Sequence, residues 1–447
     1  MELRAAWHDL RNLHQELLSF APHEGAAFLA VEPSADRLVM RSYRVFGPED
    51  LDGNGAGNVV LTESSQLAGL VEIKRSGHAL VEAHTHPGAD TTLAFSPYDD
   101  HQLPSFARYV RLKLPGKPFG ALVFGRRGYA GRAYSDAGVA PLELRGVGEL
   151  RSAPTWLRRE ESASKLDELR YDRQIRALGP SGQHRLQRLR VGVVGLGGTG
   201  SQVVQQLAHL GVRDFVLVED DRVEPSNLPR LAGAAWWDAL RRTAKTTIAR
   251  RSIRRLARRA EIRRTGALRK LSSLVALADV DLIIGCVDND GARLILAELA
   301  AAHLVPYLDL GVGIEIGSGV ESMGGRASFY LPGGPCLACA DELDFAEAGE
   351  DLESEALKRV RVVRGYARDR GVEPALMPLN TAVVGLGMIE LLAFATGWRS
   401  VVAFSRYDAV GGRIIQRNVD LNPDCPLCGP AFAMGDRHEI GRYALAS

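Results

Sequence analysis

The stretch RVGVVGLGGTGSQVVQQLAHLGVRDFVLVED, residues 190–220, decides the fold of the second half of the chain. It begins as a continuous apolar strand, runs into a glycine-rich turn, continues as an amphipathic helix and ends in a second apolar strand. Strands that are apolar on both faces belong in the middle of a parallel sheet covered by helices. The stretch therefore predicts a βαβ unit whose glycines and helix N-terminus let a phosphate approach the backbone.

Further strands and polar residues around this unit point to ATP. DLIIGCVDN (281–289) and VPYLDLGV (305–312) are expected to be additional central strands, with a helix between them. A glycine turn alone is also typical of nicotinamide-dependent oxidoreductases, which stay open as an alternative. Arg230 and Lys245 would bring two cations to a phosphate chain, and Asp288 ends a strand where a carboxylate can hold Mg²⁺. Cleavage of ATP at the α-phosphate calls for such a set, whereas hydride transfer does not.

The stretch YDRQIRALGPSG, which begins at Tyr171, and the motifs up to VEDDRVEPSNLPR (218–230) resemble the ThiF/MoeB adenylyltransferases, whose fold the ubiquitin-activating enzymes share. The likeness extends over about residues 168–430. It implies a Rossmann-like α/β adenylation domain with a structural zinc site. It further implies that ATP and Mg²⁺ are used to adenylate the C-terminal glycine of a ubiquitin-like (β-grasp) protein.

The resemblance also assigns roles to individual residues. Glu219 takes the place of the ribose-binding acid, where the family more often has Asp, and Asp288 matches the metal-linked aspartate. Arg173 matches an arginine that reaches into the partner's ATP site in a homodimer. The remaining ATP-binding residues are the phosphate loop Gly195, Gly197, Gly198 and Gly200, then Asp221, Asn227, Arg230 and Lys245. A surface ion pair for Arg173, and a cap of the helix at 290–302 for Asp288, stay open as structural alternatives.

Four of the five cysteines form two C-x₂-C pairs, Cys336/Cys339 and Cys425/Cys428. Four thiolates in this spacing suit a closed, tetrahedral structural Zn²⁺ site, and the alternative is four free buried thiols. Cys286 is expected to be a small buried residue within a strand. Because residues 345–380 contain no cysteine, we expect the chain to carry no thioester on itself and to pass its acyl-adenylate to an external acceptor.

The first half contains a second constellation, HTHPGADTTLAFSPYD, residues 84–99. His84 and His86 alternate at the end of an expected strand and so point to one side. With Asp99 they would supply three ligands to Zn²⁺, leaving one position for water, and Glu24 precedes another strand as a possible base. An isolated H-x-H is also typical of a polar strand end, and Asp100 is a rival ligand.

This set resembles the JAMM/MPN metallopeptidases, a cytidine-deaminase-like α+β fold, over about residues 10–130. The resemblance implies that His84, His86 and Asp99 hold a catalytic zinc and that Glu24 activates the water. Ser96 would help to stabilise the oxyanion. The spacing from His86 to Ser96 is two residues longer than the family commonly has.

The domain organisation follows from these two likenesses. We expect a metallopeptidase-like domain at 1–150, a charged helical linker at 151–170 and the adenylyltransferase domain at 171–447. Within the first domain, strands are expected at 26–32, 37–46, 79–86, 109–114 and 119–125, after a helix at about 6–20.

The leading functional hypothesis is a bifunctional enzyme that cuts at the C-terminus of a ubiquitin-like protein and then adenylates it, in a bacterial conjugation or defence pathway. The alternative is sulfur-carrier activation, in which the adenylate becomes a thiocarboxylate. A conjugating-enzyme-like protein or a sulfurtransferase would be the further partner, and a scaffold with one inactive domain is another possibility.

Composition limits the remaining partners. The net charge of +1 gives no general reason to expect nucleic acid, and no 18-residue uncharged apolar run predicts a membrane span. An arginine-rich run at 241–264 is interpreted as a solvated helix face. The charged N-terminal segment and the C-x₂-C usage favour the cytoplasm.

Overall fold

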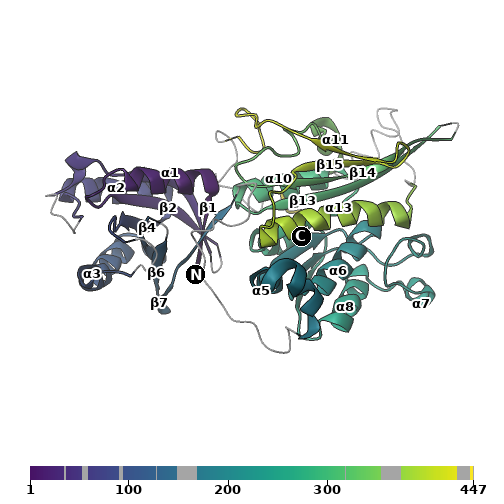
Figure 1. Cartoon of the computed structure of the whole chain (residues 1–447), viewed down its shortest axis with the longest axis horizontal. Helices are drawn as coiled ribbons and strands as arrows, with labels where there is room; N and C mark the ends of the chain where they lie inside the picture. Colours follow the sequence, from purple (N-terminus) through teal and green to yellow (C-terminus); the bar gives the residue numbers. More distant parts are fainter. Residues whose placement is uncertain are drawn as a thin grey trace. The chain divides into compact units, whose positions relative to one another are not determined.

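The computed structural model describes residues 1–34, 37–52, 59–89, 94–126, 128–147, 169–317, 319–353, 374–429 and 443–445. These residues divide into two compact units, one from Met1–Glu149 and the other from Glu160–Met434 and His438–Ser447. Nearly all of the expected linker at 151–170 lies outside the described residues. Each unit is described below by itself (Figure 1).

The first unit is an eight-stranded mixed sheet with helices on both faces. Its strands lie in the order β7-β6-β5-β4-β2-β3-β1-β8. The elements are β1 (Glu2–Ala6), α1 (Trp7–Leu18), β2 (Ala26–Ser34), β3 (Arg37–Val45), α2 (Glu63–Ser76), β4 (Ala79–Thr85), α3 (Pro97–Lys113), β5 (Phe119–Phe124), β6 (Tyr129–Ser135), β7 (Gly138–Pro141) and β8 (Glu143–Val147).

Alternating side chains of the strands build two cores, one on each face of this sheet. Leu10, Leu13 and Leu17 of α1 pack on one face, against residues such as Val81 of β4. Helices α2 and α3 cover the opposite face, where Leu80 of the same strand is buried. Because successive side chains of a strand point to opposite faces, His84 and His86 lie on the α2/α3 face.

The strand expected at 109–114 is wrong, because this segment is the last part of helix α3. YVRLKL alternates in the manner of a strand, but its apolar residues serve a helix. Val110 continues a buried stripe that starts at Leu103 and Ala107, whereas Leu112 is 75% exposed. The spacing of three and four residues, read over the whole helix, is the signal that decides.

The second unit is a doubly wound sheet in the order β11-β10-β9-β12-β13-β14-β15-β16. The five strands from β11 to β13 are parallel and the remaining ones pair antiparallel. The elements are α5 (Asp172–Arg188), β9 (Arg190–Val194), α6 (Gly198–Leu210), β10 (Asp214–Val218), α7 (Trp236–Leu240), α8 (Lys245–Leu256), β11 (Glu261–Thr265), α9 (Leu271–Ala278), β12 (Leu282–Gly285), α10 (Asp290–Ala302), β13 (Tyr307–Ile316), β14 (Val320–Tyr330), α11 (Phe345–Leu352), α13 (Met377–Thr396), β15 (Phe404–Asp408) and β16 (Arg413–Arg417).

Helices cover both faces of this sheet, as predicted for strands that are apolar on both sides. Helices α5, α6, α8 and α13 form one layer (Figure 1), and α9 and α10 pack on the other face. The 20-residue helix α13 is long and apolar enough to cross a membrane by composition alone. Val383, Val384 and Leu391 of α13 are buried in the core against the sheet, which accounts for its apolar character.

The strand order positions the functional residues. Strand β9 is central, with β10 on one side and β12 on the other. From β9 to β11 the strands are added toward one edge of the sheet and from β12 onward toward the other, so the switch point lies between β9 and β12. Ligands of open α/β sheets bind at the carboxyl ends of the strands at such a switch point. The glycine turn follows β9, Glu219 follows β10 and Asp288 follows β12, so all three reach this edge.

Candidate functional site

The glycine turn between β9 and α6 is closely packed on one side and open on the other. Gly195 has φ +82°, and a Cβ atom on Gly200 would lie 1.8 Å from the Gly195 carbonyl oxygen. A Cβ atom on Gly197 would meet no atom within 4 Å. The turn therefore leaves open space at the N-terminus of α6, where backbone N–H groups favour an anion.

Glu219 is bonded to this turn. Its carboxylate accepts hydrogen bonds from the backbone N–H of Leu196, at 2.9 Å, and from those of Asp220 and Asp221, both at 3.0 Å. A carboxylate held in this way at the end of β10 is oriented before any ligand arrives. This arrangement agrees with the ribose-binding position that the resemblance implies.

Lys245 begins helix α8 and lies within the site. Its Nζ atom is 2.7 Å from the Asp221 carboxylate and 3.9 Å from that of Glu219. A cavity of about 320 Å³ lies beside it and is also lined by Asp220, Asp221, Arg222, Glu224, Asn227 and Arg242. Asn227 uses its Oδ1 atom to accept the backbone N–H of Glu224 at 3.1 Å, so part of its side chain shapes the turn. The side chain of Arg230 runs alongside Gly198.

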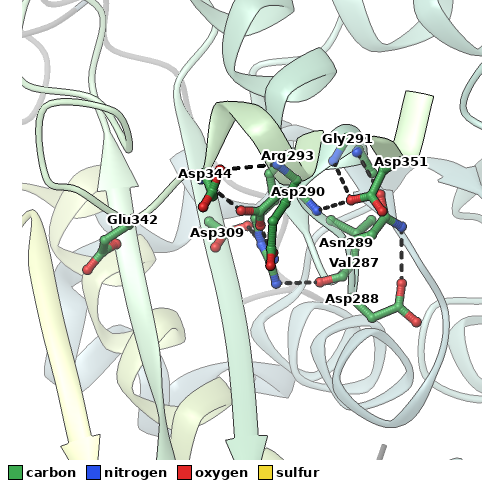
Figure 2. Close-up of polar contacts among 12 residues, drawn as sticks. Val287, Asp288, Asn289, Asp290, Gly291, Arg293, Asp309, Glu342, Asp344 and Asp351 are labelled. Atoms are coloured by element: carbon green, nitrogen blue, oxygen red, sulfur yellow. Dashed lines mark hydrogen bonds and ion pairs between the residues drawn. The ribbon is translucent and has the colours of Figure 1, made fainter. Parts of the chain in front are cut away.

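Asp288 lies in the turn after β12, and it is not the cap of the following helix. The cap of α10 is Asn289, whose Oδ1 atom accepts the backbone N–H of Ala292 at 2.8 Å. The Asp288 carboxylate is exposed and accepts only the Asn289 side-chain amide, at 3.2 Å, among the contacts drawn in Figure 2. The structural alternative considered for Asp288 is therefore excluded, and its carboxylate is available to a metal ion.

Arg173 lies in the first turn of α5 and is exposed. Within the described residues it forms no ion pair, so the surface ion pair considered as its structural alternative is not observed.

Four cysteine side chains meet on the face of the second sheet that carries α9 and α10. Their Sγ atoms all lie within 4.8 Å of one another, with 3.6 Å between Cys336 and Cys425 and 3.5 Å between Cys339 and Cys428. Four thiolates at tetrahedral Zn–S bonds of about 2.3 Å would be about 3.8 Å apart, so this geometry fits Zn²⁺. Hydrogen bonding from Cys428 lowers the pKa of Cys336 to about 6, which favours a thiolate there.

The sequence predicts Cys286 within a strand, but the residue lies one position past the end of β12. It is partly buried, and burial raises the pKa of its thiol well above the usual range. This thiol is therefore not an activated nucleophile.

The second constellation also assembles, in the first unit. The Nε2 atoms of His84 and His86 lie 3.4 and 3.5 Å from the two oxygens of Asp99. Glu24 is 3.8 Å from His86. The three predicted ligands offer atoms within 4.8 Å of one another, a spacing that fits one metal ion. Asp100, the rival ligand, is instead paired with Arg132 at 2.5 Å.

The charges in this cluster compensate one another. Burial raises the pKa of Asp99, but the two imidazoles beside it outweigh this effect and hold that pKa well below its usual range. Burial raises the pKa of Glu24, partly offset by the two histidines. A carboxyl whose pKa is raised in this way is suited to accept a proton from water.

Ser96 has a local structural role that the sequence did not reveal. Its hydroxyl donates to the Asp99 carboxylate at 2.8 Å and accepts the backbone N–H of Asp99 at 3.2 Å. The backbone N–H of Ser96 donates to the same carboxylate at 2.7 Å. This capping box at the start of α3 aims Asp99 at the histidines despite the lengthened loop. The oxyanion role of Ser96 stays a prediction.

Asn380 is a candidate site residue that the sequence did not single out. It lies in the first turn of α13, is 2% exposed, and its amide nitrogen would be 2.3 Å from a Cβ atom on Gly198. A polar residue in an otherwise apolar helix, following Pro378 at the helix start, is the signal that could have revealed it.

Known proteins resemble the second half of this chain. The ThiF family matches residues 171–427. The "SAMP-activating enzyme E1" of Haloferax volcanii is 29% identical over 60% of this chain and 90% of its own length. The "Molybdopterin-synthase adenylyltransferase" of Escherichia coli K12 is 31% identical over 58% and 96%, and the "Sulfur carrier protein adenylyltransferase" of Thermus thermophilus is 29% identical over 58% and 90%.

These relatives contradict the leading functional hypothesis from the sequence. One is named as an activating enzyme and two as adenylyltransferases, one of them of a sulfur carrier protein, and none of the three is named for hydrolysis. A bifunctional enzyme that cuts and adenylates a ubiquitin-like C-terminus for conjugation or defence is therefore wrong, and the relatives favour its alternative, sulfur-carrier activation.

The family match begins at Tyr171 and does not include the first unit, so the JAMM/MPN assignment there stays a prediction. The match includes the glycine turn, Glu219, Lys245, Asp288 and all but the last of the four clustered cysteines, and it covers more than half of the chain. The chain therefore belongs to the ThiF family.

Proposed function

We propose that the chain is an ATP-dependent adenylyltransferase that activates the C-terminal carboxylate of a sulfur-carrier protein with a ubiquitin-like (β-grasp) fold. The observation that carries the proposal is that the glycine turn, Glu219 with Lys245 beside it, and Asp288 all lie at the carboxyl edge of the sheet, at its switch point. The name of the relative from Thermus thermophilus supports a sulfur-carrier protein as the substrate.

The proposed reaction is the transfer of an adenylyl group from ATP to the carboxylate. A carboxylate oxygen of the carrier's terminal glycine attacks the α-phosphorus of ATP, the bond to the β-phosphate breaks, and pyrophosphate leaves. The N–H groups at the start of α6 hold the phosphates, and Lys245 and Arg230 neutralise charge that develops on them. Asp288 would hold Mg²⁺, which neutralises phosphate charge when bound.

The product is an acyl-adenylate whose acceptor is external. Since residues 345–380 contain no cysteine and Cys286 has a raised pKa, the nucleophile would come from outside the chain. The terminal sulfur of a sulfurtransferase persulfide would displace AMP and form an acyl persulfide. A second thiol would then cleave the S–S bond, which releases the thiocarboxylate and leaves a disulfide. A covalent adduct between this chain and the carrier that reducing agents release would contradict this route.

The direct test is ATP–pyrophosphate exchange with a small β-grasp protein that ends in Gly-Gly. We expect exchange with the free C-terminus and none with the same protein amidated there, because an amide cannot attack phosphorus in this way. Exchange that is equal with both, or none with either, would refute the proposal. Addition of sulfide should then give a mass increase of the carrier that corresponds to a thiocarboxylate.

The proposal includes two structural features of the second unit. The four clustered cysteines would hold a structural Zn²⁺, since their spacing fits a tetrahedral thiolate site. The chain would form a cytoplasmic homodimer in which Arg173 completes the partner's ATP site. Both features are testable by the predictions below.

We also propose a Zn²⁺ site in the first unit, held by His84, His86 and Asp99. What supports it is the convergence of the three side chains and the raised pKa of Glu24 beside them. When bound, the metal would lower the pKa of a water molecule, and Glu24 could accept its proton. Metal analysis of the purified chain tests the site independently of any substrate.

A further inference from the structure

A chain of buried charges links Asp288 to the antiparallel half of the second sheet. Its centre is Asp309 on β13, which is 0% exposed. The Tyr307 hydroxyl donates to Asp309 at 2.8 Å, and the guanidinium of Arg326 lies 3.2 Å from it. A carboxylate so deeply buried needs such partners, because an unpaired charge there is strongly destabilising.

Arg293, on α10, connects Asp309 to the turn that carries Asp288. Its Nε atom lies 3.5 Å from Asp309. Its Nη2 atom donates to the carbonyl of Val287 at 2.9 Å and its Nη1 atom to the Asp290 carboxylate at 2.7 Å (Figure 2). Arg293 therefore forms hydrogen bonds with the residues on both sides of Asp288. Since the Asp288 carboxylate has few contacts of its own, the backbone of this turn sets its direction.

Arg326, on β14, continues the charge chain on the other side of Asp309. It lies 3.8 Å from Glu342, which is 4% exposed and follows the first cysteine pair. Glu342 in turn accepts the Ser328 hydroxyl and lies 3.3 Å from Arg417 on β16. The four charges alternate in sign, in the order Arg293, Asp309, Arg326 and Glu342.

We propose that Arg293 and Arg326 are positioning residues that hold Asp288 in the direction needed to bind the metal ion of the nucleotide. The inference rests on the proposed function, in which Asp288 is the metal-linked carboxylate. Arg293 fixes the turn directly. Arg326 acts through Asp309, whose charge holds the Arg293 guanidinium in place.

A conservative substitution can separate the orientation of Asp288 from the stability of the fold. The fork of an arginine reaches the Val287 carbonyl, the Asp290 carboxylate and Asp309 together, whereas a lysine has a single nitrogen and cannot. Arg293→Lys keeps the positive charge but cannot form the hydrogen bonds to Val287 and Asp290 together. Arg417→Met is a matched control, because Arg417 contacts Glu342 but not Asp309.

The test measures ATP binding by calorimetry on the full chain, with and without Mg²⁺, alongside thermal unfolding of each variant. Partners of metal ligands typically change metal affinity by about 10–100-fold when they are removed. We expect Arg293→Lys to raise the Mg²⁺ concentration needed for half-maximal enhancement of ATP binding by about tenfold, and Arg326→Met by a smaller factor. Affinity for ATP without Mg²⁺ should change little, and Arg417→Met should keep the wild-type Mg²⁺ dependence.

The outcomes separate the inference from the proposed function. Wild-type Mg²⁺ dependence in both Arg293→Lys and Arg326→Met would overturn the inference, as would an equal shift in Arg417→Met. If Arg326→Met does not fold, Arg293→Lys decides alone, since its charge is conserved. If the wild-type chain itself binds no ATP in the presence of Mg²⁺, the proposed function fails regardless of the variants.

Discussion

Alanine at Gly200 should lower the stability of the second unit, whereas alanine at Gly197 should weaken ATP binding, although the two glycines are only three residues apart. A Cβ atom at position 200 would lie 1.8 Å from the Gly195 carbonyl oxygen, which is backbone and has little room to move. A Cβ atom at position 197 would meet nothing within 4 Å. The first substitution therefore tests packing, and the second tests the open space at the start of α6.

The expected magnitudes follow from these contacts. Overpacking in a dense core costs about 1–3 kcal/mol or more, and the overlap at Gly200 places it at the upper end. For a unit of this size each kcal/mol lowers the melting temperature by about 2–4 °C, so a cost of about 3 kcal/mol in Gly200→Ala should lower it by roughly 6–12 °C. Gly197→Ala should change it by less than about 3 °C. Its methyl group would, however, occupy the space of a phosphate and weaken ATP binding at least about tenfold, or 1.4 kcal/mol.

The assay combines differential scanning calorimetry with titration of ATP in the presence of Mg²⁺. Wild-type melting of Gly200→Ala would show that the close approach to Gly195 is not present in solution. Wild-type ATP affinity of Gly197→Ala would show that phosphates do not occupy the open space, and the nucleotide site would have to be assigned elsewhere.

Four further predictions concern separate parts of the chain. Arg251 lowers the pKa of Asp238, so the pair stabilises the fold at neutral pH and this contribution is lost as the pH falls toward the lowered pKa. Asp238→Asn should lower the free energy of unfolding, measured in urea, by about 2 kcal/mol at pH 7. The difference in this free energy between wild type and variant should shrink below about pH 4, and a difference that does not depend on pH would contradict the pairing. Cys339→Ser should lose one equivalent of zinc, measured by mass spectrometry, and lower the melting temperature of the second unit. Cys286→Ser should keep that equivalent, and equal zinc content in the two variants would argue against the four-cysteine site. His86→Ala should lose a further metal equivalent that the exposed His101→Ala retains, and unchanged metal content in His86→Ala would rule out the site in the first unit. Arg173→Ala and Lys245→Ala should each be inactive in ATP–pyrophosphate exchange. When equal amounts of the two variants exchange subunits, half of the dimers contain one subunit of each kind, and one of the two sites in such a dimer is complete. The mixture should therefore recover about a quarter of the wild-type activity. Failure of the mixture to recover activity would exclude a site completed by the partner.

The grouping of the proposed nucleotide-site residues at one edge of the sheet could be predicted from the sequence, because these residues follow strands with unambiguous apolar runs. RVGVV and DFVLV became β9 and β10, and the parallel topology then brought Glu219 and Asp288 to one edge without further information. The cysteine and histidine clusters were recognised for a similar reason, since short spacings such as C-x₂-C and H-x-H define a local geometry.

Other features depend on contacts that no local pattern reports. Asp309 lies in YLDLGV, a strand that is otherwise apolar, and its partners Arg293 and Arg326 come from separate elements. Only the packed sheet shows that the three charges meet. The strand predicted at 109–114 is wrong for a similar reason. Alternation over six residues predicts a strand, and only the preceding turns of α3 show the helical spacing of the apolar residues. Strands β1 and β8 were not anticipated, since each is short and pairs with partners far apart in sequence.

The cysteine cluster joins segments that are 89 residues apart, from Cys336 to Cys425. With Zn²⁺ bound, it would act as a cross-link, and closing a loop of this length in advance removes about 4 kcal/mol of chain entropy from the unfolded state. The loop it closes includes α13, which packs against β13 and β14. A protease that cuts once within this loop would therefore produce a nicked protein that migrates as one body in a native gel. Chelation would remove this cross-link and leave the two fragments held only by packing such as that of α13 on the sheet.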